Sequence, residues 1–374
     1  MNRTADVAII GGGIVGLAHA YMALRRGLRV VLFDREEFAI GASVRNFGMI
    51  WPIGQEPGIG LDRAMRSRHH WNEVATDAGI WCNPSGSLHL AYNEDEEEVL
   101  EEFIAMYSNS GYQCKMIDPA SAIAKSNYIK KDGLKSALWS DTEMTVYPRE
   151  AIRRIPIWLE EKYGLVRLFG QVVTEVMLPY VRTTRELWHA ERAVICSGAD
   201  FETLFPYEYE QHNLIKCKLQ MMKITTNVAM NIGPSLCAGL TLRHYSAFSK
   251  CKSLQKLSER FDNENPKLKE HGIHILVSQN NDGELIIGDS HHYFKTVEPF
   301  DSEEVNEIIL TYLQNFLPVD NYKILERWHG IYPKFPGHLN LLLEPSPGVQ
   351  IVNGLGGAGM TLSFGLAEEI VSKW

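Results

Sequence analysis

Three glycines near the amino terminus, Gly11, Gly13 and Gly16, form a GxGxxG motif. In such a motif the first glycine permits a tight turn, the second lets the backbone approach a pyrophosphate, and the third lets a helix pack close to a strand. Asp34 follows Gly16 by 18 positions. At about this spacing a carboxylate accepts hydrogen bonds from a ribose, so these four residues predict a dinucleotide-binding site.

The sequence around this motif predicts the elements that position it. Residues 6–10 are an apolar, β-branched run, residues 17–26 favour a helix, and residues 29–33 form a second apolar run that ends at Asp34. The N–H groups at the start of the helix would then face the phosphates. A glycine-rich structural turn would explain the glycines but not the acidic residue. The motif alone does not distinguish FAD from NAD.

Length, composition and charge limit the class of protein. A chain of 374 residues with 45% hydrophobic and 22% charged residues has the balance of a globular protein with two or three domains. Its 46 acidic and 37 basic residues give a net charge of −9, which argues against a nucleic-acid-binding surface. The 6 cysteines include no CxxC pair. This pattern favours reduced thiols and predicts a cytoplasmic protein.

Residues 7–24 are the longest nearly uncharged run of the chain. A signal peptide or a membrane-spanning helix is the simplest interpretation of such a run. Four glycines within it and the basic pair Arg25 and Arg26 directly after it favour a buried strand, turn and helix instead. The sequence therefore predicts no integral membrane segment.

The middle of the chain has a different pattern. Residues 85–92, 217–225 and 273–278 alternate or run apolar, and residues 284–288 follow the turn sequence Asn281-Asp-Gly283. These runs predict an antiparallel sheet, with residues 273–288 as a hairpin. Residues 302–316 predict an amphipathic helix with Asp301 or Ser302 as its cap.

Three later segments carry a family resemblance: GASVRNFG at residues 41–48, GQVVTEV at residues 170–176 with RAVICSGA at 192–199, and NGLGGAGMT at 353–361. With the first motif, they resemble the D-amino-acid-oxidase-like family of FAD-dependent oxidoreductases, the group of glycine oxidase and sarcosine oxidase. The resemblance implies an α/β fold (α+β overall), in which a Rossmann-like FAD-binding domain with a parallel sheet is interleaved with an antiparallel-sheet substrate domain. The implied FAD-binding segments are residues 1–80, 145–215 and 325–374, and the implied substrate-binding segments are residues 81–144 and 216–324.

The resemblance also implies how FAD is held. Ser43, Arg45 and Asn46 match a segment that wraps the pyrophosphate, and Val173 matches a valine whose backbone binds adenine. The glycines of residues 354–359 would pass under the flavin ring, and the helix that begins near Met360 would direct its N-terminus at the reduced flavin. The full set of implied FAD-binding residues is Gly11, Gly13, Gly16, Asp34, Arg35, Ser43, Arg45, Asn46, Val173, Ser197, Gly198, Gly354, Gly357, Gly359, Met360 and Thr361.

Residues 327–333, RWHGIYP, bear on the substrate. In amino-acid oxidases of the family the matching segment reads approximately GLRP, and its arginine binds the substrate carboxylate. Tyr332 stands at that position here. Sarcosine oxidases carry a flavin-linking cysteine near Gly330, and none is present here. The resemblance therefore implies non-covalent FAD and a substrate other than a standard α-amino acid.

A narrower resemblance covers residues 42–55, which are similar to a branch of the family associated with phosphonate catabolism. It implies a substrate such as an N-alkylated 2-aminoethylphosphonate. A phosphonate dianion needs several hydrogen-bond donors, and each candidate has an alternative role in packing or as a solvated charge. The candidates are Trp51, His244, Tyr245 and Lys334 for substrate binding, and His329 and Tyr332 as catalytic residues that hydrogen-bond the amine.

No metal site is predicted, because the neighbouring His291 and His292 would point in opposite directions on a strand. The chemistry that the resemblance implies is hydride transfer from the α C–H of a small amine to flavin N5, followed by hydrolysis of the imine. The electron acceptor, oxygen or another, is left open. Two alternatives remain: an oxidase or dehydrogenase of a D-amino acid, glycine or sarcosine, and a non-catalytic binding protein on the same fold.

Overall fold

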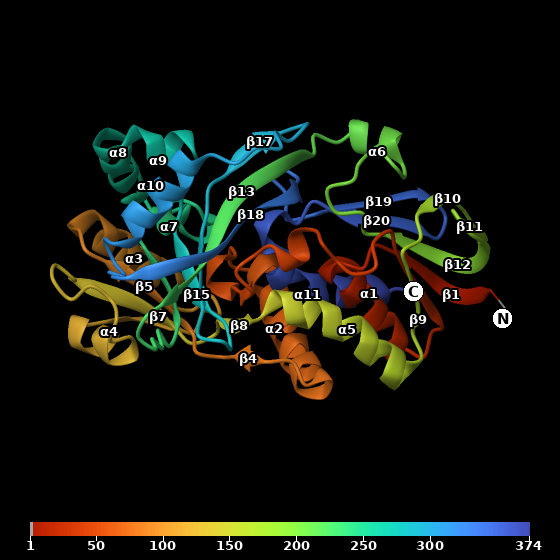
Figure 1. Ribbon diagram of the computed structural model, residues 1–374, viewed down its shortest axis with the longest axis horizontal. Helices are drawn as coiled ribbons and strands as arrows, with labels where there is room; N and C mark the ends of the chain where they lie inside the picture. Colours follow the sequence, from red (N-terminus) through yellow and green to blue (C-terminus); the bar gives the residue numbers. More distant parts are fainter. Residues whose placement is uncertain (1–2) are drawn as a thin grey trace.

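The computed structural model describes residues 3–374 and contains two large sheets (Figure 1). In the first sheet, β1 (Thr4–Ile10) pairs in parallel with β2 (Val30–Asp34) on one side and with β12 (Leu187–Ile195) on the other. The parallel arrangement extends to β9 beyond β2 and to β20 beyond β12. The remaining strands of this sheet are β9 (Val166–Phe169), β10 (Val173–Met177), β11 (Tyr180–Thr183), β19 (Leu341–Ser346) and β20 (Val349–Asn353).

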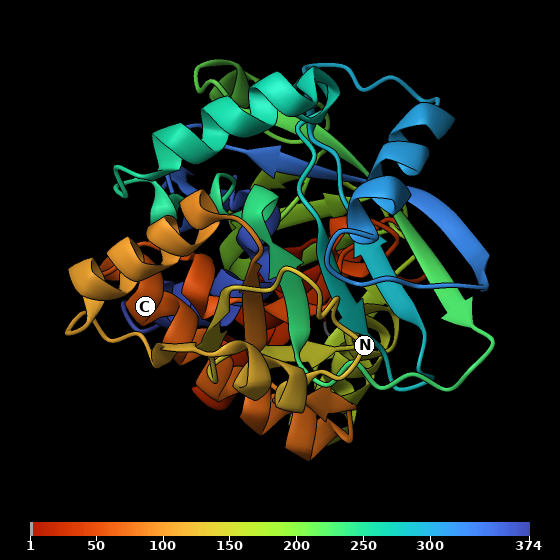
Figure 2. The same ribbon diagram turned by 90° about the vertical axis from the view of Figure 1, so that its left-hand side faces the viewer.

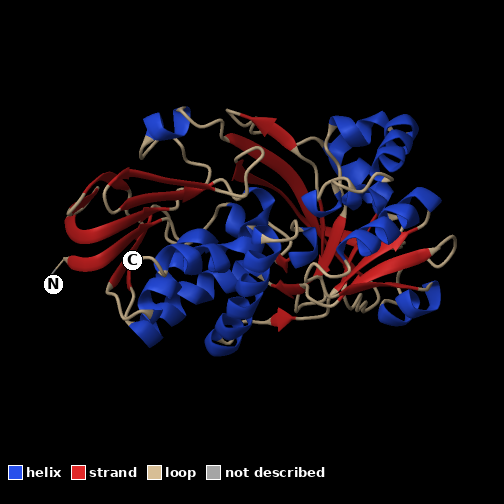
Figure 3. Cartoon of the chain, turned by 180° about the vertical axis from the view of Figure 1, so that it is seen from behind, coloured by secondary structure: helices blue, strands red, loops and turns tan. Residues whose placement is uncertain are grey.

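Side chains of β1 alternate between two hydrophobic cores, as the period of a strand requires. Val7 and Ile9 are fully buried against a layer of helices, whereas Ala8 and Ile10 belong to the core on the opposite face. Figure 3 shows the helices gathered beside the strands. The helices of this layer are α1 (Ile14–Arg25), α2 (Ile59–Ala78), α5 (Pro148–Tyr163) and α11 (Gly359–Val371).

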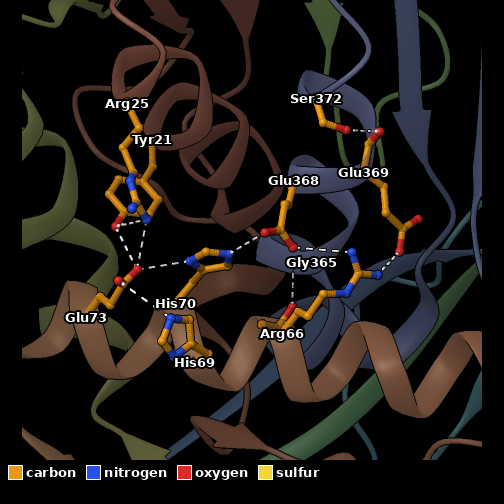
Figure 4. Close-up of polar contacts among 11 residues, drawn as sticks. Tyr21, Arg25, Arg66, His69, His70, Glu73, Gly365, Glu368, Glu369 and Ser372 are labelled. Atoms are coloured by element: carbon orange, nitrogen blue, oxygen red, sulfur yellow. Dashed lines mark hydrogen bonds and ion pairs between the residues drawn. The ribbon is translucent and has the colours of Figure 1, made fainter.

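Helices α2 and α11 approach each other closely, and polar contacts join them (Figure 4). The His70 ring of α2 lies between two carboxylates, with Nδ1 3.1 Å from Glu73 and Nε2 3.4 Å from Glu368. The Gly365 N–H donates a hydrogen bond to Ser67 Oγ at 2.7 Å. A Cβ atom on Gly365 would lie 2.3 Å from a backbone oxygen of α2. Glycine therefore permits this helix contact, which fixes α11 against the rest of the layer.

The second sheet is antiparallel except for one pair, β5 with β14. Its longest pairing joins β13 (Ile215–Thr226) to β18 (Tyr322–Lys334) along almost the whole of both strands. The other strands are β5 (Ser87–Ala91), β6 (Cys114–Ile117), β7 (Ser136–Ser140), β14 (Ser235–Ala238), β15 (Leu276–Gln279), β16 (Leu285–Gly288) and β17 (His292–Phe294). A small sheet of β3 (Met49–Ile50), β4 (Cys82–Asn83) and β8 (Met144–Val146) completes the strands.

Helices surround the second sheet, as Figure 2 shows with this end of the molecule facing the viewer. Among them, α3 packs on β6 and β7, and α10 packs on β13. The helices of this half are α3 (Glu94–Tyr107), α4 (Pro119–Lys125), α7 (Gly239–Leu242), α8 (Leu254–Glu264), α9 (Pro266–Glu270) and α10 (Glu303–Leu313). The short helix α6 (Pro206–Glu210) follows β12. Within the described residues, no helix is both long and apolar enough to span a membrane.

The predicted architecture is confirmed. The glycine motif lies between β1 and α1, the hairpin forms from β15 and β16, and α10 begins directly after Ser302. One boundary needs correction. A division at residue 325 cuts through β18, which pairs with β13 along its length and therefore belongs with the second sheet. The rest of the division into segments stays a prediction.

Candidate active site

One large cavity, with a volume of about 1310 Å³, is lined by residues from both sheets. Its first wall is the edge of the parallel strands. Because β1, β2, β12 and β20 run in the same direction, their carboxyl ends meet at one edge. The residues that follow or end these strands, Gly11, Asp34, Ser197 and Gly354, all line the cavity. Ligands of such sheets bind at this edge.

The glycines of the first motif lie against closely packed atoms that leave no room for side chains. Gly11 has φ +113°, and a Cβ atom there would lie 2.2 Å from the Cys196 carbonyl oxygen. A Cβ atom on Gly13 would lie 2.9 Å from Ser43 Oγ. Gly16 is the one predicted FAD-binding residue that does not line the cavity. A Cβ atom there would lie 1.9 Å from the Gly11 oxygen, so Gly16 lets α1 pack against the turn.

The N-terminus of α1 opens toward the cavity. The Ile14 N–H donates a hydrogen bond to Ser43 Oγ at 2.9 Å, and Ser43 lies on the short 3₁₀ turn η1 (Ala42–Val44). No acidic side chain occupies the first turn of α1. The partial positive charge of the helix end is thus left for a bound anion.

Asp34 lies at the end of β2, beside this helix end. Its carboxylate accepts hydrogen bonds from the Gly12 N–H at 2.6 Å and from the Glu36 N–H at 2.9 Å. These contacts hold the carboxylate at the cavity wall, where it can accept hydrogen bonds from a ribose. Arg35, the next residue, forms an ion pair with Asp200, which also lines the cavity.

The second glycine-rich turn lies beside the first. It continues from β20 through the 3₁₀ turn η4 (Gly356–Ala358) into α11. The backbone of the turn is held from outside, because Trp71 Nε1 donates a hydrogen bond to the Met360 oxygen at 2.7 Å, and the Trp51 N–H donates one to Thr361 Oγ1 at 2.9 Å. The N-terminus of α11 therefore has a fixed direction relative to the cavity.

These features fit FAD. The two glycine turns leave room where side chains would obstruct, the carboxylate of Asp34 suits a ribose, and two helix N-termini suit charges of the cofactor. The predicted FAD-binding residues that line the cavity are Gly11, Gly13, Asp34, Arg35, Ser43, Arg45, Asn46, Val173, Ser197, Gly198, Gly354, Gly357, Gly359, Met360 and Thr361.

The cavity is also lined by the predicted substrate residues Trp51, His244, Tyr245, Tyr332 and Lys334. The Tyr332 side chain is nearly covered, with 7% exposure, and burial raises the pKa of its hydroxyl well above the ordinary value. Burial also raises the pKa of Tyr245. Both hydroxyls therefore stay protonated at neutral pH and can donate hydrogen bonds. Lys334 Nζ donates to the Tyr293 hydroxyl at 3.2 Å.

The Tyr332 hydroxyl approaches the second glycine-rich turn. A Cβ atom on Gly357 would lie 3.6 Å from its hydroxyl oxygen. The hydroxyl thus lies over the glycine turn that resembles the flavin-binding segment of the family. The residue that replaces the expected arginine is therefore in the cavity, next to the place where the cofactor chemistry would occur.

The prediction for His329 needs correction. Its side chain does not line the cavity; instead Nδ1 lies 3.1 Å from both carboxylate oxygens of Asp301. Residues three apart on a strand face opposite sides, so His329 cannot share the orientation of Tyr332. His329 contributes its backbone oxygen, which accepts a hydrogen bond from Arg45 at 3.1 Å. We therefore assign it no catalytic role.

Sequence reasoning missed His274 and Asp289, and it treated His291 only together with its neighbour. All three line the cavity. His292 does point away, and its ring nitrogen lies 3.1 Å from that of His271. The predicted hairpin of residues 273–288 could have indicated that His274 and Asp289 lie together. Continuing it outward by a few residues from β15 and β16 places His274 beside Asp289, and their backbones exchange two hydrogen bonds of 2.7 and 3.1 Å.

Comparison with protein families identifies the chain. Residues 6–373 match the family described as DAO, FAD dependent oxidoreductase. The chain belongs to this family, and it is an FAD-dependent oxidoreductase.

Curated relatives match part of the chain. The hydrogen cyanide synthase protein HcnC of Pseudomonas aeruginosa is 39% identical over 172 residues, which are 45% of this chain and 39% of that protein. One chain of the anaerobic glycerol-3-phosphate dehydrogenase of Escherichia coli K12 is 30% identical over 122 residues, 32% of this chain and 22% of that protein. The alignments thus span less than half of each relative.

Solved structures share the fold over the whole chain. Glycine oxidase from Geobacillus kaustophilus superposes with a TM-score of 0.79 at 18% identity and covers 100% of this chain and 94% of its own. L-Proline dehydrogenase from P. horikoshii gives a TM-score of 0.81 at 19% identity, with 100% and 93% coverage. At this level of identity the likeness concerns the fold.

Proposed function

We propose that this enzyme oxidises a small amine that carries a phosphonate group, such as an N-alkylated 2-aminoethylphosphonate. The observation that carries the proposal is the position of Tyr332. Its hydroxyl lies over the Gly357 turn, where an amino-acid oxidase of the family would present the arginine that binds a carboxylate. A different anionic group, bound by a different set of donors, accounts for this replacement.

The donors that line the same cavity as Tyr332 support such a group. Lys334 supplies a positive charge, and Tyr245 and Tyr332 supply hydroxyls that burial keeps protonated. Of the two arginines that line the cavity, Arg35 pairs with Asp200, and Arg45 donates to the His329 backbone oxygen. Arg35 is thus engaged by a carboxylate of the protein, and Arg45 lies on the segment that the resemblance assigns to the FAD pyrophosphate, so neither is proposed to bind a substrate carboxylate, the arrangement that favours α-amino acids.

The protein groups would act by positioning. FAD, when bound, supplies the redox chemistry by accepting a hydride from the carbon next to the amine. Tyr332 and Lys334 would hold the anionic end of the substrate, which orients the amine end. Trp51 is 3% exposed, and with Tyr245 it forms an aromatic part of the wall, with ring centroids 6.2 Å apart. This wall would exclude water from the reacting carbon.

The test is the flavin spectrum of the purified holoenzyme under anaerobic conditions. N-Methyl-2-aminoethylphosphonate is added to one sample, and glycine, sarcosine and D-alanine are added to others. We expect the phosphonate to bleach the flavin absorbance faster than each of the three amino acids. Bleaching by an amino acid alone would assign the enzyme to the amino-acid oxidases, whether oxidase or dehydrogenase, and would overturn the proposed substrate.

A matched analogue isolates the phosphonate contribution. N-Methyl-β-alanine has a carboxylate in place of the phosphonate and a similar chain length. If the dianion is recognised, this analogue should reduce the flavin at least ~10-fold more slowly, the difference expected from the loss of about one charge-assisted hydrogen bond. Equal rates would show that the enzyme does not distinguish the phosphonate from the carboxylate.

A further inference from the structure

Three histidines converge at the second-sheet end of the cavity. His244 follows α7, His274 precedes β15 and His291 precedes β17, so three separate segments contribute. Each ring offers one nitrogen, and these nitrogens lie within 4.8 Å of one another. The ring centroid of His244 lies 3.8 Å from that of His274 and 4.4 Å from that of His291. We refer to these three residues as the histidine cluster.

The rings of the cluster carry lone pairs. His291 Nδ1 lies 3.0 Å from the Gly272 carbonyl oxygen. A carbonyl oxygen can only accept, so Nδ1 carries the proton and the neutral ring keeps its lone pair on Nε2. The neutral ring with a free lone pair is the form of histidine that binds metal ions.

A buried carboxylate completes the surroundings. Asp289 is 3% exposed, and its Oδ1 lies 2.9 Å from His274 Nδ1, while Oδ2 lies 3.8 Å from His291 Nε2. The first contact is poorly aligned, so within the described residues neither Oδ1 nor Nδ1 has a hydrogen-bond partner. A buried carboxylate without a hydrogen bond or a cation is unfavourable. The site thus favours a positive ligand, whereas an anion would lie beside a negative charge.

We propose that the histidine cluster binds one divalent transition-metal ion such as Zn²⁺. Imidazole nitrogens bind Zn²⁺ at about 2.0–2.1 Å, so in a tetrahedral site they lie roughly 3.4 Å apart; small side-chain rotations bring the three nitrogens to this spacing. The Gly272 oxygen fixes the orientation of His291, and Asp289 Oδ1, 2.9 Å from His274 Nδ1, would accept a hydrogen bond from that ring after a small rotation. Ligand histidines in metal sites usually have such outer partners.

Three protein ligands leave a fourth coordination position open, and the cluster lines the cavity. An oxyanion oxygen can occupy that position. If the proposed function is correct, the ion would therefore bind the substrate phosphonate and supply positive charge beside Lys334. This consequence rests on the proposed function, but binding of the ion does not.

The experiment measures metal binding directly. The holoenzyme is dialysed against a chelator, freed of it, and titrated with Zn²⁺ in competition with a chromophoric chelator, and the bound metal is counted by elemental analysis. We expect one Zn²⁺ per chain with a Kd of roughly 1 µM or lower. H274Q and H291Q should abolish this binding, and D289N should weaken it by about 10–100-fold.

H292Q is the matched control, because His292 is adjacent in sequence but contacts His271 outside the cluster. It should keep the wild-type affinity. FAD content and thermal unfolding of each variant show whether it is folded. The wild type gives a second measurement that needs no variant: anomalous scattering from zinc-soaked crystals should place the ion at the cluster.

Two results would overturn the proposal. One is wild-type holoenzyme that binds no Zn²⁺ with a Kd below about 1 mM. The other is unchanged affinity in folded H274Q and H291Q. Neither result depends on turnover, so a failure here leaves the amine chemistry untouched. Conversely, a protein that binds Zn²⁺ at the cluster but oxidises amino acids alone would keep this proposal and remove the phosphonate substrate.

Discussion

Ser43 accepts a hydrogen bond from the backbone N–H of Ile14 at 2.9 Å, and this contact joins the η1 turn to the first turn of α1. The two residues are 29 positions apart. A polar side chain from a later loop thus occupies one of the free N–H groups of the helix, while the rest of the helix end faces the cavity. The contact places Arg45 and Asn46, which follow on the same loop, beside the N-terminus of α1.

Replacing Ser43 with alanine should weaken FAD binding. The substitution removes the hydrogen bond to Ile14 and releases the loop from the helix, at a cost of about 1 kcal/mol. We expect the FAD dissociation constant to rise about 5-fold, measured by fluorescence of released flavin during dilution.

S372A serves as the control for this experiment. The Ser372 hydroxyl likewise hydrogen-bonds the backbone, here by donating to the Glu369 oxygen at 3.1 Å, but Ser372 is exposed directly after α11 and does not line the cavity (Figure 4). Its FAD affinity should match that of the wild type. An S43A protein with unchanged affinity would show that the loop is held in place by other contacts.

Y332F should lower the affinity for the amine and leave FAD binding unchanged. The variant loses one hydrogen bond to a charged group, which is worth about 1.5–3 kcal/mol, so the substrate concentration for half-maximal flavin reduction should rise at least ~10-fold. Because burial raises the pKa of Tyr332 well above its ordinary value, the wild-type pH profile should show no loss of binding from this hydroxyl up to about pH 10.

Tyr322 lies at the other end of β18, opposite Thr226, and Y322F therefore controls for a change in the same strand. Its kinetics should equal those of the wild type. Substrate binding that is the same in Y332F and in the wild type would remove Tyr332 from the substrate site.

Stability should fall at acidic pH because of buried histidines. Neither ring nitrogen of His89 has a hydrogen-bond partner within the described residues, and burial lowers its pKa to about 3. The unfolded chain, in which a histidine has a pKa of about 6.5, binds the proton more readily. The stabilisation is therefore complete above about pH 6.5 and is lost as the pH falls toward the folded pKa, by up to about 1.4 kcal/mol per pH unit.

Thermal unfolding at about pH 7 and about pH 5 tests this expectation. H89L removes the titrating ring from the core, so its unfolding temperature should fall less between the two values than that of the wild type. Some decrease in the unfolding temperature of H89L remains, because burial also lowers the pKa of His19 to about 4. H69Q, at a site whose side chain is 69% exposed, should behave as the wild type. The same fall in H89L and wild type would contradict the assignment.

The sequence was sufficient where the residues that act together are close along the chain or follow a recurrent spacing. The GxGxxG turn, the helix after it and Asp34 form one strand–turn–helix–strand unit, and local backbone requirements decide its shape. The hairpin of β15 and β16 is likewise local, because the turn Asn281-Asp-Gly283 sets its register. Tyr332 could be singled out because residues 327–333 resemble a segment of the family.

Pairing between strands that are far apart in the sequence determined the other features of the site. The face of β18 that lines the cavity is set by the register of β18 with β13, a strand far away in the sequence. In this register Leu219 pairs with Gly330. This register turns His329 outward. The histidine cluster likewise exists because three loops end at one wall. The hairpin brings residue 274 close to residues 289 and 291, but no spacing in the sequence marks residue 244 as their neighbour, since its loop meets them only after the sheet has fixed where each loop begins.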